Sequence, residues 1–310
     1  MLKSSLEFLG CNAKVVLPLG VVVALFLPDS SDKLRFIVPW LIGLIYTVSF
    51  LRIDLRVMLA DAFRPQQIVW SIAVSLLLLV IIPLILISLS LFVGVDPRYI
   101  PSVVWYAVAP PIASTAWMCG LLGLNMAVAM KIVVITSLLS PFTGPVLASI
   151  FLGAAVPVSS IEMLTDLAVM IFGGILVAQL WQKVTGQEWI DRNDTALSGL
   201  SAVAMLLFLV PVFNGVLERS IAMPVMGLHL LILTCALNFS TQAVFLLLAR
   251  FSGKENTAQT NCVLAVVGGN RNVGLYYGAL PPDPVFGLFT ALYQVPIYLT
   301  PFILSWWLRR

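Results

Sequence analysis

The sequence predicts an all-α integral membrane protein in which ten transmembrane helices form two inverted five-helix repeats, with broken, crossing helices at the fourth and ninth positions. The first observation is composition: 60% of the 310 residues are hydrophobic and 10% are charged, whereas an ordinary soluble domain is about 25% charged. The second is a series of long apolar runs, which are too continuous for the alternating strands of an outer-membrane barrel. The third is that two of these runs contain residues that interrupt a helix.

The charge balance and the cysteine count exclude several other classes of protein. Seventeen basic and 14 acidic residues give a net charge of +3, without the strongly basic surface of a nucleic-acid-binding protein. Four cysteines do not form the framework of a disulfide-rich secreted module. The chain has no Cys-x-x-Cys pair, His-x-x-x-His pair or Gly-rich phosphate loop. We therefore expect no metal, no other cofactor and no enzymatic activity.

Ten apolar runs approach or exceed the length of about 20 residues that a helix needs to cross the hydrocarbon core. The predicted spans are 14–28, 35–51, 67–94, 101–130, 132–153, 160–182, 196–216, 221–249, 258–280 and 285–308. Polar or proline-rich segments separate most of them, but spans four and five are divided only at Lys131. Spans 1–5 make up the first repeat, residues 1–153, and spans 6–10 the second, residues 154–310, within one transmembrane unit.

The distribution of Lys and Arg predicts that both termini are cytoplasmic, in the inner or plasma membrane of a cell. These residues stay preferentially on the cytoplasmic side. With ten spans and a cytoplasmic N-terminus, twelve of the 17 fall inside and four outside, while Arg271 alone falls within a span. The outside residues are Lys33, Arg35, Arg98 and Arg219. The first apolar run ends at Pro28 without a small-residue cleavage site, so we expect a transmembrane helix there and not a signal peptide.

Spans four and nine contain helix-breaking residues. Span four carries Pro110-Pro111, which removes two backbone donors and disfavours a helical residue before each proline. Span nine carries three glycines, two asparagines and one arginine within residues 268–274. Because the two spans are five apart, an odd number, they have opposite orientations, as in inverted-repeat secondary transporters whose broken helices meet near the bilayer midplane. An ordinary proline kink is the alternative for span four.

These features resemble the bile acid:sodium symporter family, within the bile/arsenite/riboflavin transporter superfamily. Residues Gly269 to Leu275 read Gly-Asn-Arg-Asn-Val-Gly-Leu where that family carries Gly-Met-Gln-Asn-Ser-Gly-Leu or a similar run. Pro110 lies fifteen residues before Asn125, and Ser140-Pro141 follows in span five, as in the family. The resemblance implies secondary transport of a small solute by alternating access between two inverted halves.

The chain departs from the family at the sodium site. The resemblance places Val267 at the position of a sodium-binding Glu and Arg271 at that of a Gln. The family's Ser-Asn pair in span four falls on Thr115-Ala116, and its span-five Thr falls on Val133. Sodium needs oxygen ligands, so we expect transport without sodium coupling, with the fixed cation of the arginine standing in for the ion.

The arsenite efflux permeases share the implied architecture, but their motif is absent. They carry Ala-Pro-Cys in span four, where this chain has Ala109-Pro110-Pro111. Cys119 lies eight residues beyond Pro111, in a different part of the helix. Arsenite is therefore disfavoured as the substrate.

Five residues at the two breaks are predicted to bind substrate. They are Arg271, Asn270, Asn272, Thr115 and Ser114. An arginine at mid-span costs about 2.5–3.5 kcal/mol on insertion scales, so it either contacts an anion or donates hydrogen bonds to carbonyls of the unwound chain. The asparagines bind a polar solute or satisfy freed backbone groups, and the two hydroxyls bind solute or bond to carbonyls of their own helix.

The function predicted from these residues is secondary transport of a small organic anion, with a small-molecule substrate and the lipid bilayer as partners. The alternative is a transport-inactive membrane sensor or scaffold that keeps the fold. An intramembrane enzyme is disfavoured, because the spans contain no paired carboxylates. Span eight contains Asn238, Ser240, Thr241 and Gln242, for which interhelical hydrogen bonds are favoured over a cavity-facing role.

Overall fold

The computed structural model describes residues 2–27, 32–53, 55, 58, 60, 64–153 and 159–308. Every regular element in these ranges is helical. Seven helices are long and apolar enough to cross a membrane, and the bent pair Lys3–Cys11 and Val15–Ala24 raises the number to eight. The prediction of an all-α, multi-pass membrane protein is therefore confirmed. The predicted boundary between residues 153 and 154 adjoins residues 154–158, which lie outside the described ranges, as do Pro28, Arg309 and Arg310.

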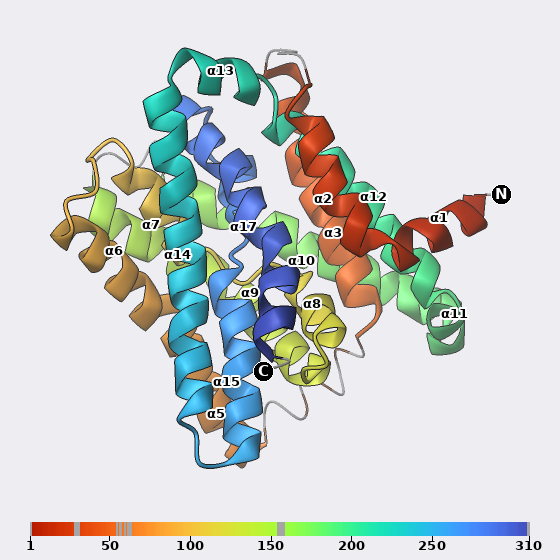
Figure 1. The fold of residues 1–310 in the computed structure, drawn as a ribbon. Coiled ribbons are helices and arrows are strands. Elements are labelled where there is room, and N and C mark those ends of the chain that lie inside the picture. The colour runs from red at the N-terminus through yellow and green to blue at the C-terminus, as the bar shows by residue number, and fades with distance from the viewer. Residues whose placement is uncertain are drawn as a thin grey trace.

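The described helices follow one another along the chain with few long connections (Figure 1). In order they are α1 (Leu2–Cys11), α2 (Ala13–Ala24), the 3-10 helix η1 (Asp32–Ile37), α3 (Val38–Leu51), α5 (Pro65–Leu76), the π-helical segment η2 (Leu77–Ile81), α6 (Ile82–Phe92), α7 (Ile100–Val108), α8 (Thr115–Leu121), α9 (Met126–Leu152), α10 (Ser160–Thr185), α11 (Gln187–Arg192), α12 (Asp194–Val212), α13 (Val216–Ala222), α14 (Pro224–Arg250), α15 (Glu255–Gly269), α16 (Val273–Ala279) and α17 (Pro284–Leu308).

One group of helices, which we call the first bundle, comprises α1, α2, η1, α3, α10 and α12. Helix α12 packs against α1, α2 and α3, and α3 packs along α10. Glycines allow close approach: a Cβ at Gly174 of α10 would lie 2.8 Å from the carbonyl oxygen of Gly43 in α3. A Cβ at Gly199 of α12 would lie 1.8 Å from the carbonyl oxygen of Leu6 in α1. Any larger residue at either position would force the helices apart.

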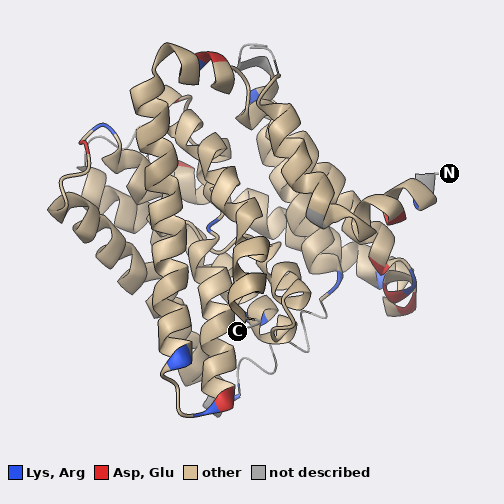
Figure 2. Cartoon of the chain, in the orientation of Figure 1, with Lys and Arg blue, Asp and Glu red and all other residues tan. Residues whose placement is uncertain are grey.

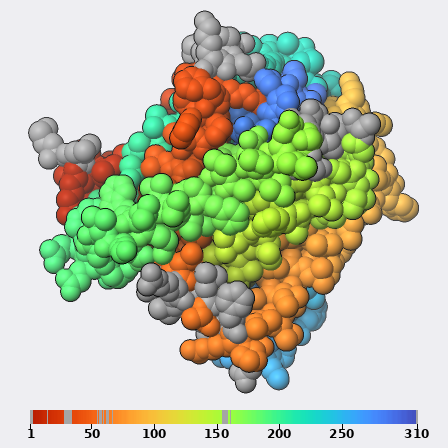
Figure 3. All heavy atoms as spheres, turned by 180° about the vertical axis from the view of Figure 1, so that it is seen from behind, coloured from red at the N-terminus to blue at the C-terminus, as the bar shows by residue number. Residues whose placement is uncertain are grey.

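Most of the remaining helices form the second bundle, which comprises α5, η2, α6, α7, α8, α9, α14, α15, α16 and α17. Helix α14 packs against α15 and α17, and α9 packs against α7 and α8. Figure 1 shows α14 and α15 on the opposite side of the molecule from α1, α2 and α12, while α17 lies between them and also contacts α2 and α12. Helix α10 of the first bundle also contacts α9 and α16 of the second. Figure 3 shows it crossing the back of the molecule between α3 and α9.

The surface has the character expected of a protein surrounded by lipid. Large apolar side chains such as Trp40, Phe92 and Val184 are 78%, 89% and 85% exposed. Figure 2 shows that Lys, Arg, Asp and Glu gather near the ends of helices, with few charges along their middle stretches. A water-soluble protein rarely exposes so much contiguous apolar surface, so these side chains are placed to face acyl chains.

One predicted boundary is wrong. Spans four and five were expected to divide at Lys131, but α9 runs without interruption from Met126 to Leu152. The chain turns earlier, where Gly123 has a φ of 72° and the side chain of Asn125 caps the helix by accepting from the amide of Val128 at 3.1 Å. Lys131 lies inside this helix, and its ammonium group is 5.8 Å from the ring centroid of Trp70.

The predicted orientation is testable with fused reporters. We expect a reporter placed after Arg64, Gly186 or Lys254 to be cytoplasmic and one placed after Asp96 or Asp283 to be external, because Lys and Arg are retained on the cytoplasmic side. Alkaline phosphatase and green fluorescent protein fusions, active on opposite sides of a bacterial membrane, provide the measurement. A cytoplasmic signal at Asp283 would contradict the ten-span topology.

Candidate functional site at the crossing of two broken helices

Two helix interruptions meet in the centre of the protein. Helix α7 ends at Val108 and α8 begins at Thr115, while α15 ends at Gly269 and α16 begins at Val273. The intervening segments pair as an isolated antiparallel bridge between Pro111 and Arg271. Both predicted breaks are therefore present, and they lie side by side.

The pairing satisfies backbone groups that the breaks expose. The amide of Asn272 donates to the carbonyl of Pro110 at 2.7 Å, and the amide of Ile112 donates to the carbonyl of Asn270 at 2.9 Å. Pro110 and Pro111 have no N–H to satisfy. The two prolines therefore leave fewer backbone N–H groups that need an acceptor at the crossing. This stabilises unwound backbone where no water is present.

Arg271 is completely buried at this crossing, and three carbonyl oxygens surround its guanidinium group. Nε donates to Gly268 at 2.8 Å, and Nη1 donates to Leu78 at 2.8 Å and to Ala109 at 3.0 Å. Gly268 and Ala109 lie at the ends of α15 and α7, where carbonyls lack helical donors. Of the two roles considered for Arg271, the structure shows hydrogen bonding to main-chain carbonyls.

The carbonyl of Leu78 is available because of a proline five residues later. In the π-helical segment η2, the amide of Ile82 donates to Leu77, and residue 83 is a proline without an N–H. Leu78 is left without its usual donor, and Arg271 supplies one. The guanidinium therefore joins three segments that are distant in sequence.

The remaining nitrogen of Arg271 has no partner among the described residues. Nη2 is buried and makes no hydrogen bond there. The ion pairs of Lys3, Arg52 and Arg98 do not include Arg271, and Asp166, the acidic residue nearest to a mid-span position in the sequence, is exposed on α10. A buried charge without a counter-charge costs several kcal/mol, which the hydrogen bonds to three carbonyls offset in part.

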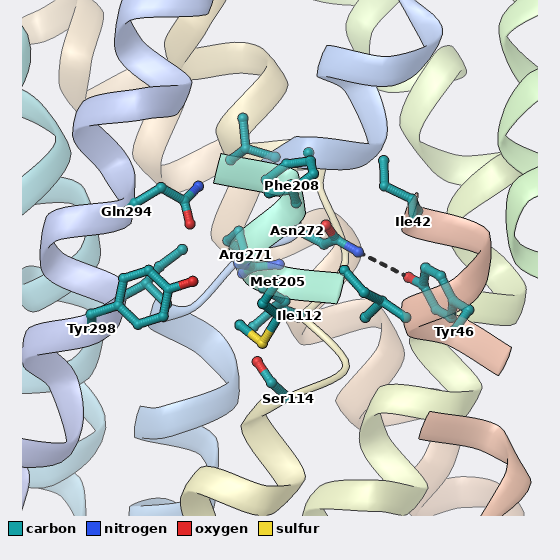
Figure 4. A pocket seen from close by; sticks show the side chains of 14 residues that line it. Ile42, Tyr46, Ile112, Ser114, Met205, Phe208, Arg271, Asn272, Gln294 and Tyr298 are labelled. Carbon is teal, nitrogen blue, oxygen red and sulfur yellow. Dashed lines mark hydrogen bonds between the residues drawn. The ribbon is translucent and has the colours of Figure 1, made fainter. Parts of the chain in front are cut away.

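A small cavity of about 30 Å³ adjoins the guanidinium (Figure 4). Its polar lining comprises Tyr46, Ser114, Arg271, Asn272, Gln294 and Tyr298. The hydroxyl of Ser114 is buried and, like Nη2, has no partner among the described residues. The volume corresponds to about two water molecules, so the cavity accommodates one compact group and not a whole organic solute.

A larger cavity of about 420 Å³ lies between the two bundles and shares Ile45, Ser114 and Met205 with the small one. Its volume is in the range of about 300–1,000 Å³ typical of small-molecule sites. It extends to Arg52, whose Nε lies 3.3 Å from a carboxylate oxygen of Asp194. The predicted orientation places these two residues at the cytoplasmic end.

The structure brings three of the five predicted site residues together around the small cavity: Ser114, Arg271 and Asn272. Asn272 donates to the hydroxyl of Tyr46 at 3.2 Å. Thr115 donates instead to the carbonyl of Ile112 at 2.7 Å, within its own break.

Asn270, the fifth predicted residue, belongs to a polar network that holds the span-nine break. Its side-chain oxygen accepts from Asn238 and from Thr300, both at 3.2 Å. Gln242 donates to Thr300 at 2.9 Å and also to Asn238. The predicted interhelical role of the span-eight amides is confirmed. Ser240 and Thr241 instead bond to the carbonyl of Leu237 in their own helix.

Several residues of the site were not predicted from the sequence. The hydroxyl of Tyr293 accepts from the amide of Arg271 at 2.6 Å and donates to the carbonyl of Gly269 at 2.8 Å. The neighbouring Gln294 and Tyr298 line the small cavity. Their concentration within the apolar run of α17 is a signal that sequence reading alone could have used, because polar groups at membrane depth usually face protein or a cavity.

Neither models of known protein families nor curated protein sequences gave a match to this chain.

Proposed function

We propose that the protein is a secondary transporter of a small organic anion that works by alternating access. The observation that carries the proposal is the buried charge of Arg271, which lines a cavity together with Ser114. Its Nη2 and the hydroxyl of Ser114 have no hydrogen-bond partner among the described residues. An anionic group of the substrate would accept hydrogen bonds from both. The apolar body of the substrate would occupy the 420 Å³ cavity beyond Ser114.

The proposed transporter has ten spans in two inverted repeats. Five spans are each counted from two consecutive helices: α1 with α2, η1 with α3, α5 with α6, α7 with α8, and α15 with α16. The other five are single helices: α9, α10, α12, α14 and α17. The broken spans are then the fourth and ninth, in line with the pattern of inverted-repeat transporters. The two bundles would move against each other to expose the cavity on alternate sides.

Transport by this protein is expected to be independent of sodium. Val267, Val133 and Ala116, which the family resemblance places at ligand positions, are apolar and at most 1% exposed. Arg271 already places a positive charge beside three main-chain carbonyls of the crossing, which disfavours a second cation there. Binding isotherms of an organic anion, measured in sodium and in choline at equal ionic strength, should coincide. A tenfold difference in affinity, about 1.4 kcal/mol, would contradict this expectation.

A transport-inactive sensor is the second candidate, and one observation favours it. The cavity beside Arg271 is only about 30 Å³, which leaves no room for passage in this conformation. Uptake of radiolabelled organic anions into proteoliposomes separates the two functions. Accumulation above that of empty liposomes supports transport, whereas saturable binding without accumulation supports a sensor.

A further inference from the structure

Arg35 joins the two bundles at the end of the molecule opposite Arg52. It lies in η1 of the first bundle, and its Nη2 lies 2.9 Å from the carbonyl oxygen of Tyr277, 2.8 Å from that of Leu280 and 3.2 Å from that of Pro281. These carbonyls end α16 in the second bundle. The guanidinium carbon also lies 4.3 Å from the ring centroid of Tyr277, which adds a cation–π contact.

Two further contacts close the same interface. The hydroxyl of Tyr277 donates to the carbonyl of Pro211 in α12 at 3.1 Å. A Cβ built at Gly278 would lie 3.2 Å from Val38 and 3.3 Å from Ile42, both in α3. The bundles therefore approach each other as closely as a glycine permits, and Val38 is completely buried.

The opposite end of the interface contains the 420 Å³ cavity that reaches Arg52. The bundles are thus closed on the Arg35 side of the crossing and separated on the Arg52 side. Opening the closed side would remove the donor from the last carbonyls of α16, which have no helical partners. The contact consequently stabilises one of the two arrangements that alternating access requires.

We propose that Arg35 is a latch that holds the protein closed on its predicted external side by bonding the end of α16. This inference rests on the proposed function only in assigning the closed and open interfaces to a transport cycle. The equilibrium between the two interfaces is measurable without substrate.

The test uses the accessibility of a buried reporter. Val38→Cys is introduced into a background in which Cys11, Cys119, Cys235 and Cys262 are replaced, and the protein is reconstituted in nanodiscs so that both faces meet solvent. A charged maleimide then labels the thiol only when the interface opens. We expect Arg35→Gln to increase the labelling rate about tenfold over the parent.

Arg98→Gln is the matched control. It removes the same charge on the same predicted side, but its partner Asp96 lies two residues away in an exposed loop. Its labelling rate should equal that of the parent. A rate for Arg35→Gln within twofold of the parent overturns the latch, as does an equal acceleration by Arg98→Gln. If Arg35→Gln cannot be isolated, Arg35→Lys, which loses the planar guanidinium, is judged by the same criterion.

Uptake by the same variants separates the latch from the proposed function. Accelerated labelling of Arg35→Gln together with absence of uptake by the parent would support the latch and contradict the proposed transport function. Unaltered labelling together with normal uptake by the parent would contradict the latch alone.

Discussion

Arg271→Gln is expected to weaken the binding of an organic anion by about 1.5–3 kcal/mol, the worth of a hydrogen bond to a charged group. It is also expected to lower the melting temperature in detergent, because one amide cannot donate to the three carbonyls that surround Arg271. Arg271→Lys should retain more stability, since an ammonium group has three donors, but it lacks the second nitrogen of the planar guanidinium and should restore affinity only in part. Calorimetry and thermal unfolding on the same preparations measure both effects.

Ser114→Ala provides the matched control for the Arg271 variants. The hydroxyl has no partner among the described residues, so its removal should leave the melting temperature unchanged while it weakens anion binding by about 0.5–1.5 kcal/mol. Reduced stability of Arg271→Gln with unaltered affinity would mean that the guanidinium serves the backbone alone, and the anion site would have to be abandoned.

Gly269→Ala is expected to destabilise the protein by about 1–3 kcal/mol, the usual cost of overpacking. An added Cβ would lie 2.6 Å from Cγ of Gln242 and 2.8 Å from the carbonyl oxygen of Asn238. The carbonyl of the same glycine accepts from Asn238, Tyr106 and Tyr293, so a displacement disturbs the whole crossing. Thermal unfolding of the purified protein measures the loss.

Gly173→Ala is the control for this substitution. Gly173 lies within α10, and a Cβ there would meet nothing within 4 Å. Because alanine favours a helix over glycine, we expect an unaltered or higher melting temperature. Equal stability of Gly269→Ala and Gly173→Ala would contradict the tight packing assigned to the crossing.

The sequence predicted the membrane class and both helix breaks, because long apolar runs, Pro110-Pro111 and the glycines of residues 268–274 act locally. It misplaced the start of α9 because the charge of Lys131 was taken as the boundary, whereas its contact with Trp70 depends on tertiary arrangement. The cap by Asn125 is a local signal that the sequence already contained. The sequence left open whether Arg271 contacts an anion or main-chain carbonyls, and it could not identify the carbonyls. The partner at Leu78 follows from Pro83 only when the two spans are known to touch.

The antiparallel bridge between the two breaks has a mechanical consequence. Since Pro110 accepts from Asn272 and Asn270 accepts from Ile112, either segment alone would expose unsatisfied backbone to hydrocarbon, at a cost of several kcal/mol for each group. In the proposed transport cycle, the four half-helices would consequently move as one rigid piece. Flexibility would then be confined to the interface between the bundles and to the loops that join them. The charge of Arg271 would move together with the four half-helices.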